Sequence, residues 1–285
     1  MFIDLGMEFF CANCLWILPI KVSWELFRLR VNCEFFAILI FNKKEVKMKE
    51  IQKKILCFSG WGQKFDSLEV VFKDDRFSNF DVESFDYSKF FGYDEFLRNF
   101  KVQNLTHKFN PDILVGWSLG GQICLKLIAN GLLRPKTLVL IAPPFQMVKD
   151  ERIKAAMGQD VFKEFYENFA NSPDATLKKF SILAAMNDKN ASQIAKTLDI
   201  NDENHKQLIS WLNDLKNTSF FDFDFGKIPQ TLFFQGKGDM IVHASQMLHF
   251  QEKIKDFTAF QYENCGHAAH LSDLERIRGD LLRFL

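Results

Sequence analysis

Short apolar runs alternate with amphipathic segments from residue 53 to the carboxyl terminus. The apolar runs are bounded by turn residues and predict strands at 53–60, 80–88, 111–118, 136–144, 230–239 and 257–267. Several are continuously apolar, which is typical of strands buried on both faces. The segments between them predict helices at 94–109, 120–133, 243–255 and 271–285. Strand and helix in alternation predict an α/β fold, a mostly parallel sheet flanked by helices.

A block of helical patterns interrupts this alternation. It contains no convincing strand. Its four amphipathic segments lie at 160–170, 175–186, 190–198 and 203–215. Helices inserted between two core strands most economically cover the carboxyl edge of the sheet, where ligands bind in open α/β folds. We therefore expect one domain, residues 48–285, with an inserted helical lid at about 146–222.

The first 47 residues follow a different pattern. Their apolar stretches are separated by the charged "KVSWELFRLR", and each is shorter than the about 20 residues that span a bilayer. Asp4 and Glu8 near the start are atypical of a signal peptide. A compact domain could begin at Met48, so we expect an N-terminal extension outside the fold; a peripheral membrane anchor is the alternative.

Composition narrows the function classes. The 285 residues are 47% hydrophobic, enough for a substantial core, and 36 basic side chains balance 36 acidic ones. The protein therefore has no net positive charge that would attract nucleic acid, and we expect no nucleic-acid partner. Six irregularly spaced cysteines suit reduced thiols and a cytoplasmic protein, and Cys11-x-x-Cys14 lacks a second pair that would complete a metal site. We also expect a monomer without a membrane span.

The stretch "ILVGWSLGGQICLKLI" at 113–128 carries the first chemical signal. Ser118 directly follows a predicted strand and precedes a predicted helix, with Gly116 and Gly120 two residues on either side. This context is typical of a nucleophile elbow, in which a strained turn projects a serine hydroxyl into a cleft. A helix cap would explain the serine but not both glycines. The pattern therefore predicts Ser118 as a nucleophile.

A nucleophilic serine needs a base and an acid that orients the base. Asp239 follows the predicted strand 230–239 in a glycine-rich turn, and His267 follows the next one. Both therefore fall at the carboxyl edge where Ser118 also lies, in the order Ser, Asp, His that is typical of the hydrolase elbow. We predict Asp239 as the acid and His267 as the base.

Other acids and histidines fit these roles less well. His270 is the second candidate for the base, but it more plausibly begins the last helix. Asp222 and Asp224 flank a linker and Asp214 belongs to the lid, so Asp239 remains the best candidate for the acid. His267 and His270 lack a third ligand of suitable spacing, and we expect no metal and no cofactor.

The tetrahedral intermediate of ester hydrolysis needs two hydrogen-bond donors for its oxyanion. One is the backbone N–H after the nucleophile, here that of Leu119, and the other comes from the loop after an early strand. That loop is "FSGWGQ", in which two glycines flank Trp61 and leave its N–H exposed. We predict Trp61 and Leu119 as the oxyanion donors, and the Trp61 indole as a wall of the acyl pocket.

Residues 54–285 resemble the α/β-hydrolase family and, within it, the pimeloyl-acyl-carrier-protein methyl ester esterases of biotin synthesis. The resemblance rests on "GWG" at 60–62, "GWSLGG" at 116–121, the lid opening "PPFQMVKDE", "GKGDMIV" and "CGHAAHLS". It implies the same triad and oxyanion donors. It also implies an acidic carrier protein as partner, bound by basic lid residues, for which the candidates are Lys149, Arg152 and Lys154.

The sequence thus predicts a serine carboxylesterase that hydrolyses the methyl ester of pimeloyl-acyl-carrier protein in biotin biosynthesis. We expect an apolar channel under the lid, lined by Trp61, Trp117 and Phe145, to hold the pimeloyl chain. Two alternatives remain open. One is a broad-specificity carboxylesterase or thioesterase acting on small acyl substrates, and the other is a non-catalytic binding protein with the hydrolase fold.

Overall fold

The computed structural model describes residues 3–11, 14–22, 52–107, 109–198, 200–201 and 203–285. The chain divides into two compact units, Met1–Glu50 and Ile51–Leu285. In the first unit β1 (Ile3–Cys11) pairs antiparallel with β2 (Cys14–Val22). The sequence patterns did not predict this hairpin. The membrane-anchor alternative for residues 1–47 lies largely outside the described residues.

A six-stranded parallel sheet forms the centre of the second unit, with the order β4-β3-β5-β6-β7-β8. Its strands are β3 (Lys53–Phe58), β4 (Phe80–Ser84), β5 (Ile113–Trp117), β6 (Thr137–Ile141), β7 (Gln230–Gly236) and β8 (Phe257–Tyr262). Every residue of the central strands β5 and β6 is buried, whereas edge strand β4 alternates between half-buried and exposed positions. The predicted parallel sheet is therefore confirmed, and the continuous apolar runs are its central strands.

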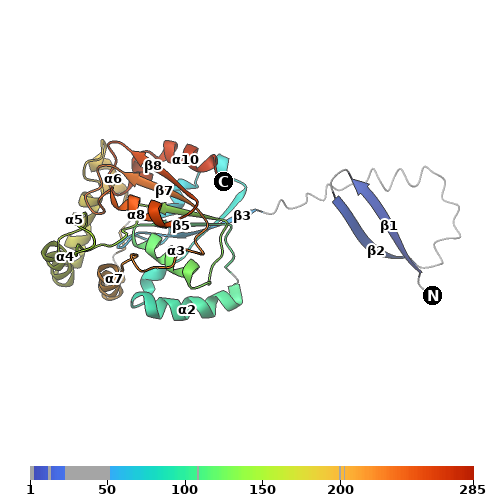
Figure 1. Ribbon diagram of the computed structural model, residues 1–285, viewed down its shortest axis with the longest axis horizontal. Helices are drawn as coiled ribbons and strands as arrows, with labels where there is room; N and C mark the ends of the chain where they lie inside the picture. Colours follow the sequence, from blue (N-terminus) through green and yellow to red (C-terminus); the bar gives the residue numbers. More distant parts are fainter. Residues whose placement is uncertain (1–2, 12–13, 23–51, 108, 199, 202) are drawn as a thin grey trace. The chain divides into compact units, whose positions relative to one another are not determined.

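Helices cover both faces of this sheet (Figure 1), with α2 on one side of it and α10 on the other. The helices of the α/β framework are α2 (Gly92–His107), α3 (Leu119–Ala129), α8 (Gln246–Lys253), α9 (Ala269–Ser272) and α10 (Leu274–Leu282). The last predicted helix, 271–285, is thus wrong in one detail, because α9 ends before Asp273 and α10 begins after it. Three short 3-10 helices follow β3 and β4, at Ser67–Val71 (η2), Asp75–Phe77 (η3) and Tyr87–Lys89 (η4).

Four helices between β6 and β7 make up what we call the helical insertion, residues 146–222. They are α4 (Gln159–Asn171), α5 (Pro173–Ala184), α6 (Ala191–Thr197) and α7 (His205–Asn217), and Figure 1 shows them together at one end of the unit. An isolated antiparallel bridge joins Gln146 to Ser219, and the N–H of Phe220 donates to the carbonyl of Phe145 at 3.2 Å. These contacts hold the two ends of the insertion side by side.

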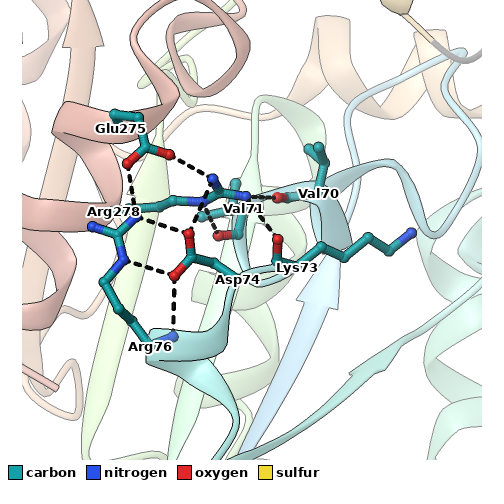
Figure 2. A network of polar contacts seen from close by, with 7 residues as sticks. All are labelled: Val70, Val71, Lys73, Asp74, Arg76, Glu275 and Arg278. Atoms are coloured by element: carbon teal, nitrogen blue, oxygen red, sulfur yellow. Dashed lines mark hydrogen bonds and ion pairs between the residues drawn. The ribbon is translucent and has the colours of Figure 1, made fainter.

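Arg278 fastens helix α10 to the segment after β3 (Figure 2). Its guanidinium, which is largely buried, donates to the backbone carbonyls of Val71 at 2.9 Å, Val70 at 2.7 Å and Lys73 at 3.1 Å. The remaining nitrogen donates to the carboxylate of Glu275 at 2.6 Å. One side chain thus satisfies three carbonyls that no strand or helix uses, which fixes the carboxyl-terminal helix against η2.

Within the described residues, no helix combines the length and the hydropathy that crossing a bilayer requires.

Candidate active site

Ser118 lies in a strained turn between β5 and α3. Its φ of 53° and ψ of −119° are a backbone conformation that non-glycine residues seldom adopt, and its N–H donates to the carbonyl of Ile141 at 2.8 Å. A side chain at Gly120 would place its Cβ 2.0 Å from the carbonyl oxygen of Phe58, and one at Gly116 would lie 2.6 Å from backbone atoms of α3. The two glycines therefore let strand and helix meet closely enough to hold the serine in this turn.

His267 and Asp239 form a buried hydrogen-bonded pair. The Nδ1 atom of His267 lies 2.7 Å from Oδ2 of Asp239, and both side chains are almost fully buried. The other carboxylate oxygen accepts the N–H groups of Ile241 at 2.8 Å and Val242 at 2.9 Å, and Gln235 donates to Oδ2 at 3.0 Å. Four donors fix the carboxylate, so the imidazole is held with Nδ1 towards the acid.

The remaining ring nitrogen of His267, Nε2, is buried and has no hydrogen-bond partner among the described residues. The main chain of His267 is held on both sides, because its N–H donates to the carbonyl of Ala184 at 2.9 Å and its carbonyl accepts from the Trp117 indole at 3.1 Å. A histidine with a fixed ring and a free Nε2 can accept a proton from a hydroxyl that approaches it.

His270, the second candidate for the base, lies elsewhere. Its ring packs against Trp117 with 4.6 Å between ring centroids, and burial, together with the nearby His267, lowers its pKa to about 3. It does not line the cavity that holds Ser118. Of the rival acids, Asp214 accepts the N–H of Tyr93 at 2.6 Å, and the exposed Asp222 pairs with Arg152 at 2.8 Å. The structure thus brings only the predicted acid against His267 within its described residues.

Ser118 lines an otherwise apolar cavity of about 30 Å³ under the helical insertion, which we call the inner cavity. Ten apolar side chains line it, among them Trp61, Met147, Phe162, Phe165 and Phe180. A polar group reaching Ser118 would therefore be surrounded by hydrocarbon, where water is scarce and electrostatic interactions are strong.

Of the two predicted oxyanion donors, Leu119 directly follows Ser118 and Trp61 lines the same cavity as Ser118. Leu119 is the first residue of α3, and the first N–H groups of a helix have no partner within it. Trp61 lies in the turn after β3, next to Gly62 at φ +71°, and its side chain lines the inner cavity. The Trp61 indole donates to the carbonyl of Leu208 in α7 at 2.9 Å. Its loop is thus tied to the insertion.

Two of the predicted substrate-binding residues do not line the inner cavity. Trp117 is buried behind His267 and packs on His270, and Phe145 is buried among phenylalanines, with Phe250 5.0 Å away between ring centroids. Their role in substrate binding stays a prediction, because apolar residues at strand ends can point into the core as readily as into a site.

The three basic candidates lie together at the surface. Lys149, Arg152 and Lys154 line one depression at the start of the insertion, and Asp150, Glu151 and Asp160 line the same depression. Arg152 is already paired with Asp222 at 2.8 Å, whereas the ammonium of Lys154 donates to the carbonyl of Asp150 at 3.1 Å. The depression is therefore mixed in charge rather than basic.

The turn between α5 and α6 contacts the loop after β7 and helix α9, which follows His267, and sequence analysis missed these contacts. Asn187, at φ +65°, donates through its side chain to the carbonyl of Gly238 at 3.0 Å, and Asp188 accepts a hydrogen bond from Ser272. The only local signal was "MND" between two helical patterns, which indicates a turn but not its partner.

The described residues hold no group of three or more histidine, cysteine or acidic side chains that could bind a metal ion, and Cys57, Cys124 and Cys265 are buried free thiols.

Comparison with known proteins gives a family and several relatives. A family model described as alpha/beta hydrolase fold matches residues 84–274. A biotin biosynthesis bifunctional protein BioHC of Teredinibacter turnerae is 30% identical over 190 residues, which are 60% of this chain and 32% of that protein. A pimeloyl-[acyl-carrier protein] methyl ester esterase of Nitrosospira multiformis is 24% identical over 198 residues, covering 64% of this chain and 72% of that enzyme. The chain thus spans about a third of the bifunctional relative.

Solved structures share the fold at lower identity. An esterase from Exiguobacterium antarcticum superposes with a TM-score of 0.67 at 16% identity, covering 81% of this chain and 91% of that one. A bromoperoxidase from Bacillus anthracis gives the same four values. At this identity the likeness concerns the fold alone.

Proposed function

The chain belongs to the alpha/beta hydrolase fold family, and from this premise we propose that it is a serine carboxylesterase acting on the methyl ester of a pimeloyl-acyl-carrier protein. One observation carries the proposal. A serine in a strained turn after β5 lines an apolar cavity, and a buried histidine with a free Nε2, paired with a buried aspartate, follows β8 at the same carboxyl edge of the parallel sheet. A cavity wall needs none of these three groups, whereas ester hydrolysis needs all of them.

In the proposed reaction, the Ser118 oxygen attacks the ester carbonyl carbon while Nε2 of His267 takes the hydroxyl proton. The Nε2 atom has no partner in the described residues, so the hydrogen bond between the two side chains forms when substrate closes the site. Asp239 keeps Nδ1 protonated and stabilises the imidazolium, and the N–H groups of Leu119 and Trp61 bind the oxyanion.

The tetrahedral intermediate then collapses. His267 returns its proton to the methoxy oxygen, methanol leaves, and the acyl group stays on Ser118. Water attacks this acyl ester while His267 again takes a proton, and the second collapse releases the carboxylic acid and restores the serine hydroxyl. No step needs a metal or an organic cofactor.

The substrate assignment is supported by relatives whose names specify pimeloyl-[acyl-carrier protein] methyl ester, and by the apolar lining around Ser118, which suits a methylene chain. Recognition of the carrier is proposed to involve Lys149, Arg152 and Lys154, which line one surface depression. The predicted cytoplasmic location and monomeric state stay predictions.

A broader carboxylesterase or thioesterase is the second candidate, and one observation favours it. The depression with the three basic residues also holds three acidic ones, and an acidic carrier would be repelled by the latter.

The deciding experiment compares the methyl ester of a pimeloyl carrier protein with the same methyl ester lacking the carrier. Wild type should strongly prefer the carrier-linked ester, and Ser118→Ala should hydrolyse neither. If wild type hydrolyses both esters equally, recognition of the carrier is excluded and the protein is a general esterase. If a fluorophosphonate probe fails to label Ser118 in folded protein, a non-catalytic binding protein is the better description.

Variants of the depression separate the two candidates further. Lys149→Glu should raise KM for the carrier-linked ester and leave the free ester unchanged, because Lys149 lines the surface depression and neither of the spaces next to Ser118. Lys163→Glu is the matched control, since Lys163 is exposed on α4 and does not line the depression. Equal effects of both variants would mean that a general change of charge, not contact at the depression, alters binding.

A further inference from the structure

A second hollow adjoins the inner cavity and shares three of its walls. We call it the outer basin, and its lining includes Lys154, Val161, Met240 and His243. The side chains of Met157, Leu183 and Ile241 line both the inner cavity and the outer basin. Since the same three side chains border both spaces, they form the wall between Ser118 and the surface.

We infer that the acyl chain of the substrate reaches Ser118 between Met157, Leu183 and Ile241, and that these three side chains determine how wide a chain the enzyme accepts. This inference rests on the proposed function, because it concerns access to the proposed nucleophile. It adds to that function the residues that set substrate specificity.

The backbone around Ile241 and Leu183 is fixed by the site itself. The N–H of Ile241 donates to Asp239 at 2.8 Å. Leu183 precedes Ala184, whose carbonyl accepts the N–H of His267 at 2.9 Å. A wide swing of the chain at either position would disturb the acid and the base. The opening therefore widens through side-chain rotation rather than through movement of α5 as a whole.

Met157 is the wall residue best able to move. Its N–H donates to the carbonyl of Met147 at 3.0 Å and its carbonyl accepts from Lys149 at 2.9 Å, so its main chain is also held. Its side chain is only half-buried and, being unbranched with three rotatable bonds, can adopt several shapes at low cost. Met157 can thus turn aside for a narrow chain, whereas branched Leu183 and Ile241 keep the opening narrow.

The outer basin indicates what lies on the surface side of the opening. Val161 is 57% exposed and Met240 is 52% exposed, which gives the basin two apolar walls. Lys154 lines both the basin and the mixed-charge depression beyond it. An unbranched hydrocarbon chain that continues into a phosphate-bearing arm fits this order, first apolar contacts and then a cation.

The test uses two esters that differ only far from the carbonyl, p-nitrophenyl hexanoate and p-nitrophenyl 5,5-dimethylhexanoate. Branching at the distal carbon leaves the chemistry at the carbonyl unchanged but widens the part of the chain that lies in the opening when the carbonyl is at Ser118. The full chain is assayed for kcat/KM on both esters and on p-nitrophenyl acetate. Wild type should prefer the unbranched hexanoate.

Met157→Ala and Leu183→Ala should each raise the branched-to-unbranched ratio by about tenfold, since each removes three heavy atoms from an apolar passage, where even one methylene changes selectivity by this order. Leu183→Trp should lower kcat/KM for both hexanoates by about tenfold and leave the acetate rate within about twofold, because a short acyl group still passes. Melting temperatures establish that each variant is folded.

Leu248→Ala and Leu248→Trp are the matched controls, since Leu248 is 51% exposed on α8 and lines neither hollow. If the folded wall variants keep the wild-type ratio, as these controls should, the inference is overturned while the proposed esterase stands. If wild type hydrolyses no ester and Ser118 resists a fluorophosphonate, the proposed function fails and the inference fails with it.

Discussion

The Nδ1 atom of His267 lies 2.7 Å from a carboxylate oxygen of Asp239, although the two residues follow different strands of the sheet. The contact depends on the parallel arrangement, because β7 and β8 are neighbours and their carboxyl ends reach the same edge. The pair is also held by the turn after β7, whose N–H groups bind the other oxygen of Asp239. Its geometry is therefore set before any substrate binds.

We expect Asp239→Asn to lower kcat for p-nitrophenyl acetate by about 10³ to 10⁴-fold. The amide keeps the size of the side chain and one acceptor oxygen, but it cannot stabilise the imidazolium and can turn its NH₂ towards His267. The control is Asp224→Asn, because Asp224 is exposed and was a rival candidate for the acid. If Asp224→Asn loses activity while Asp239→Asn keeps it, Asp224 rather than Asp239 is the acid that orients the base.

We expect His270→Leu to keep activity and to reduce the loss of stability in acid. The pKa of His270 is lowered to about 3 by burial, below the ordinary value of 6.5. A lowered pKa in the folded state means that this group's contribution is complete above pH 6.5 and is lost as the pH falls from 6.5 towards 3, where the unfolded chain binds the proton more readily.

Urea unfolding of the His270→Leu protein between pH 4 and pH 7 measures this difference. Wild type should lose more free energy of unfolding than the variant over that range. His107→Leu, at the exposed end of α2, should follow wild type. If the free energy of unfolding falls equally between pH 7 and pH 4 in wild type and in His270→Leu, His270 is not a source of acid sensitivity. Loss of esterase activity in His270→Leu would argue against His267 as the base.

Sequence patterns were sufficient for the framework of the fold and for the proximity of Asp239 and His267. The apolar runs of β5 and β6 have no polar alternation, so their burial on both faces could be predicted. Asp239 and His267 follow strands, and parallel strands end at one edge, so their proximity could be predicted as well. The comparisons confirm the predicted family and the predicted hydrolase class.

Contacts between distant segments could not be predicted in the same way. An apolar side chain such as Phe145 is buried whichever neighbour it meets, so its pattern does not say whether it lines a cavity or fills the core. The bond from Asn187 to Gly238 joins two turns, and neither turn carries a local signal for the other. The wall residue Leu183 likewise lies on the apolar side of a helix, where most side chains only pack.

We expect Gly120→Ala to prevent folding of the hydrolase unit or to abolish activity, because the new Cβ would lie 2.0 Å from the backbone oxygen of Phe58. Neither strand β3 nor helix α3 can move aside without opening the sheet. Gly279→Ala is the matched control. Gly279 lies within α10 with no atom in the way, and alanine there should stabilise the protein by about 0.5 to 1 kcal/mol. Urea midpoints compare the two variants, and similar stability of both would contradict the close packing of β3 on α3.

We expect Arg278→Leu to lower the free energy of unfolding by about 2 to 4 kcal/mol at pH 7, because it leaves the carbonyls of Val70, Val71 and Lys73 without their donor. Arg283→Leu is the control, since the Arg283 side chain is exposed and its buried partner Asp280 keeps the hydrogen bond from Tyr262, so this change should cost less than about 1 kcal/mol.

The effect of Arg278→Leu should also shrink in acid. Hydrogen bonds from Arg278 and then from Arg76 hold the pKa of Glu275 below its ordinary value of 4.5. A carboxylate with a lowered pKa contributes stability that is present above pH 4.5 and is lost as the pH falls below it. The difference in unfolding free energy between wild type and Arg278→Leu should therefore be smaller at pH 3.5 than at pH 7. A difference that stays constant with pH would mean that Arg278 acts through the backbone carbonyls alone, and that its bond to Glu275 adds nothing to the anchoring of α10.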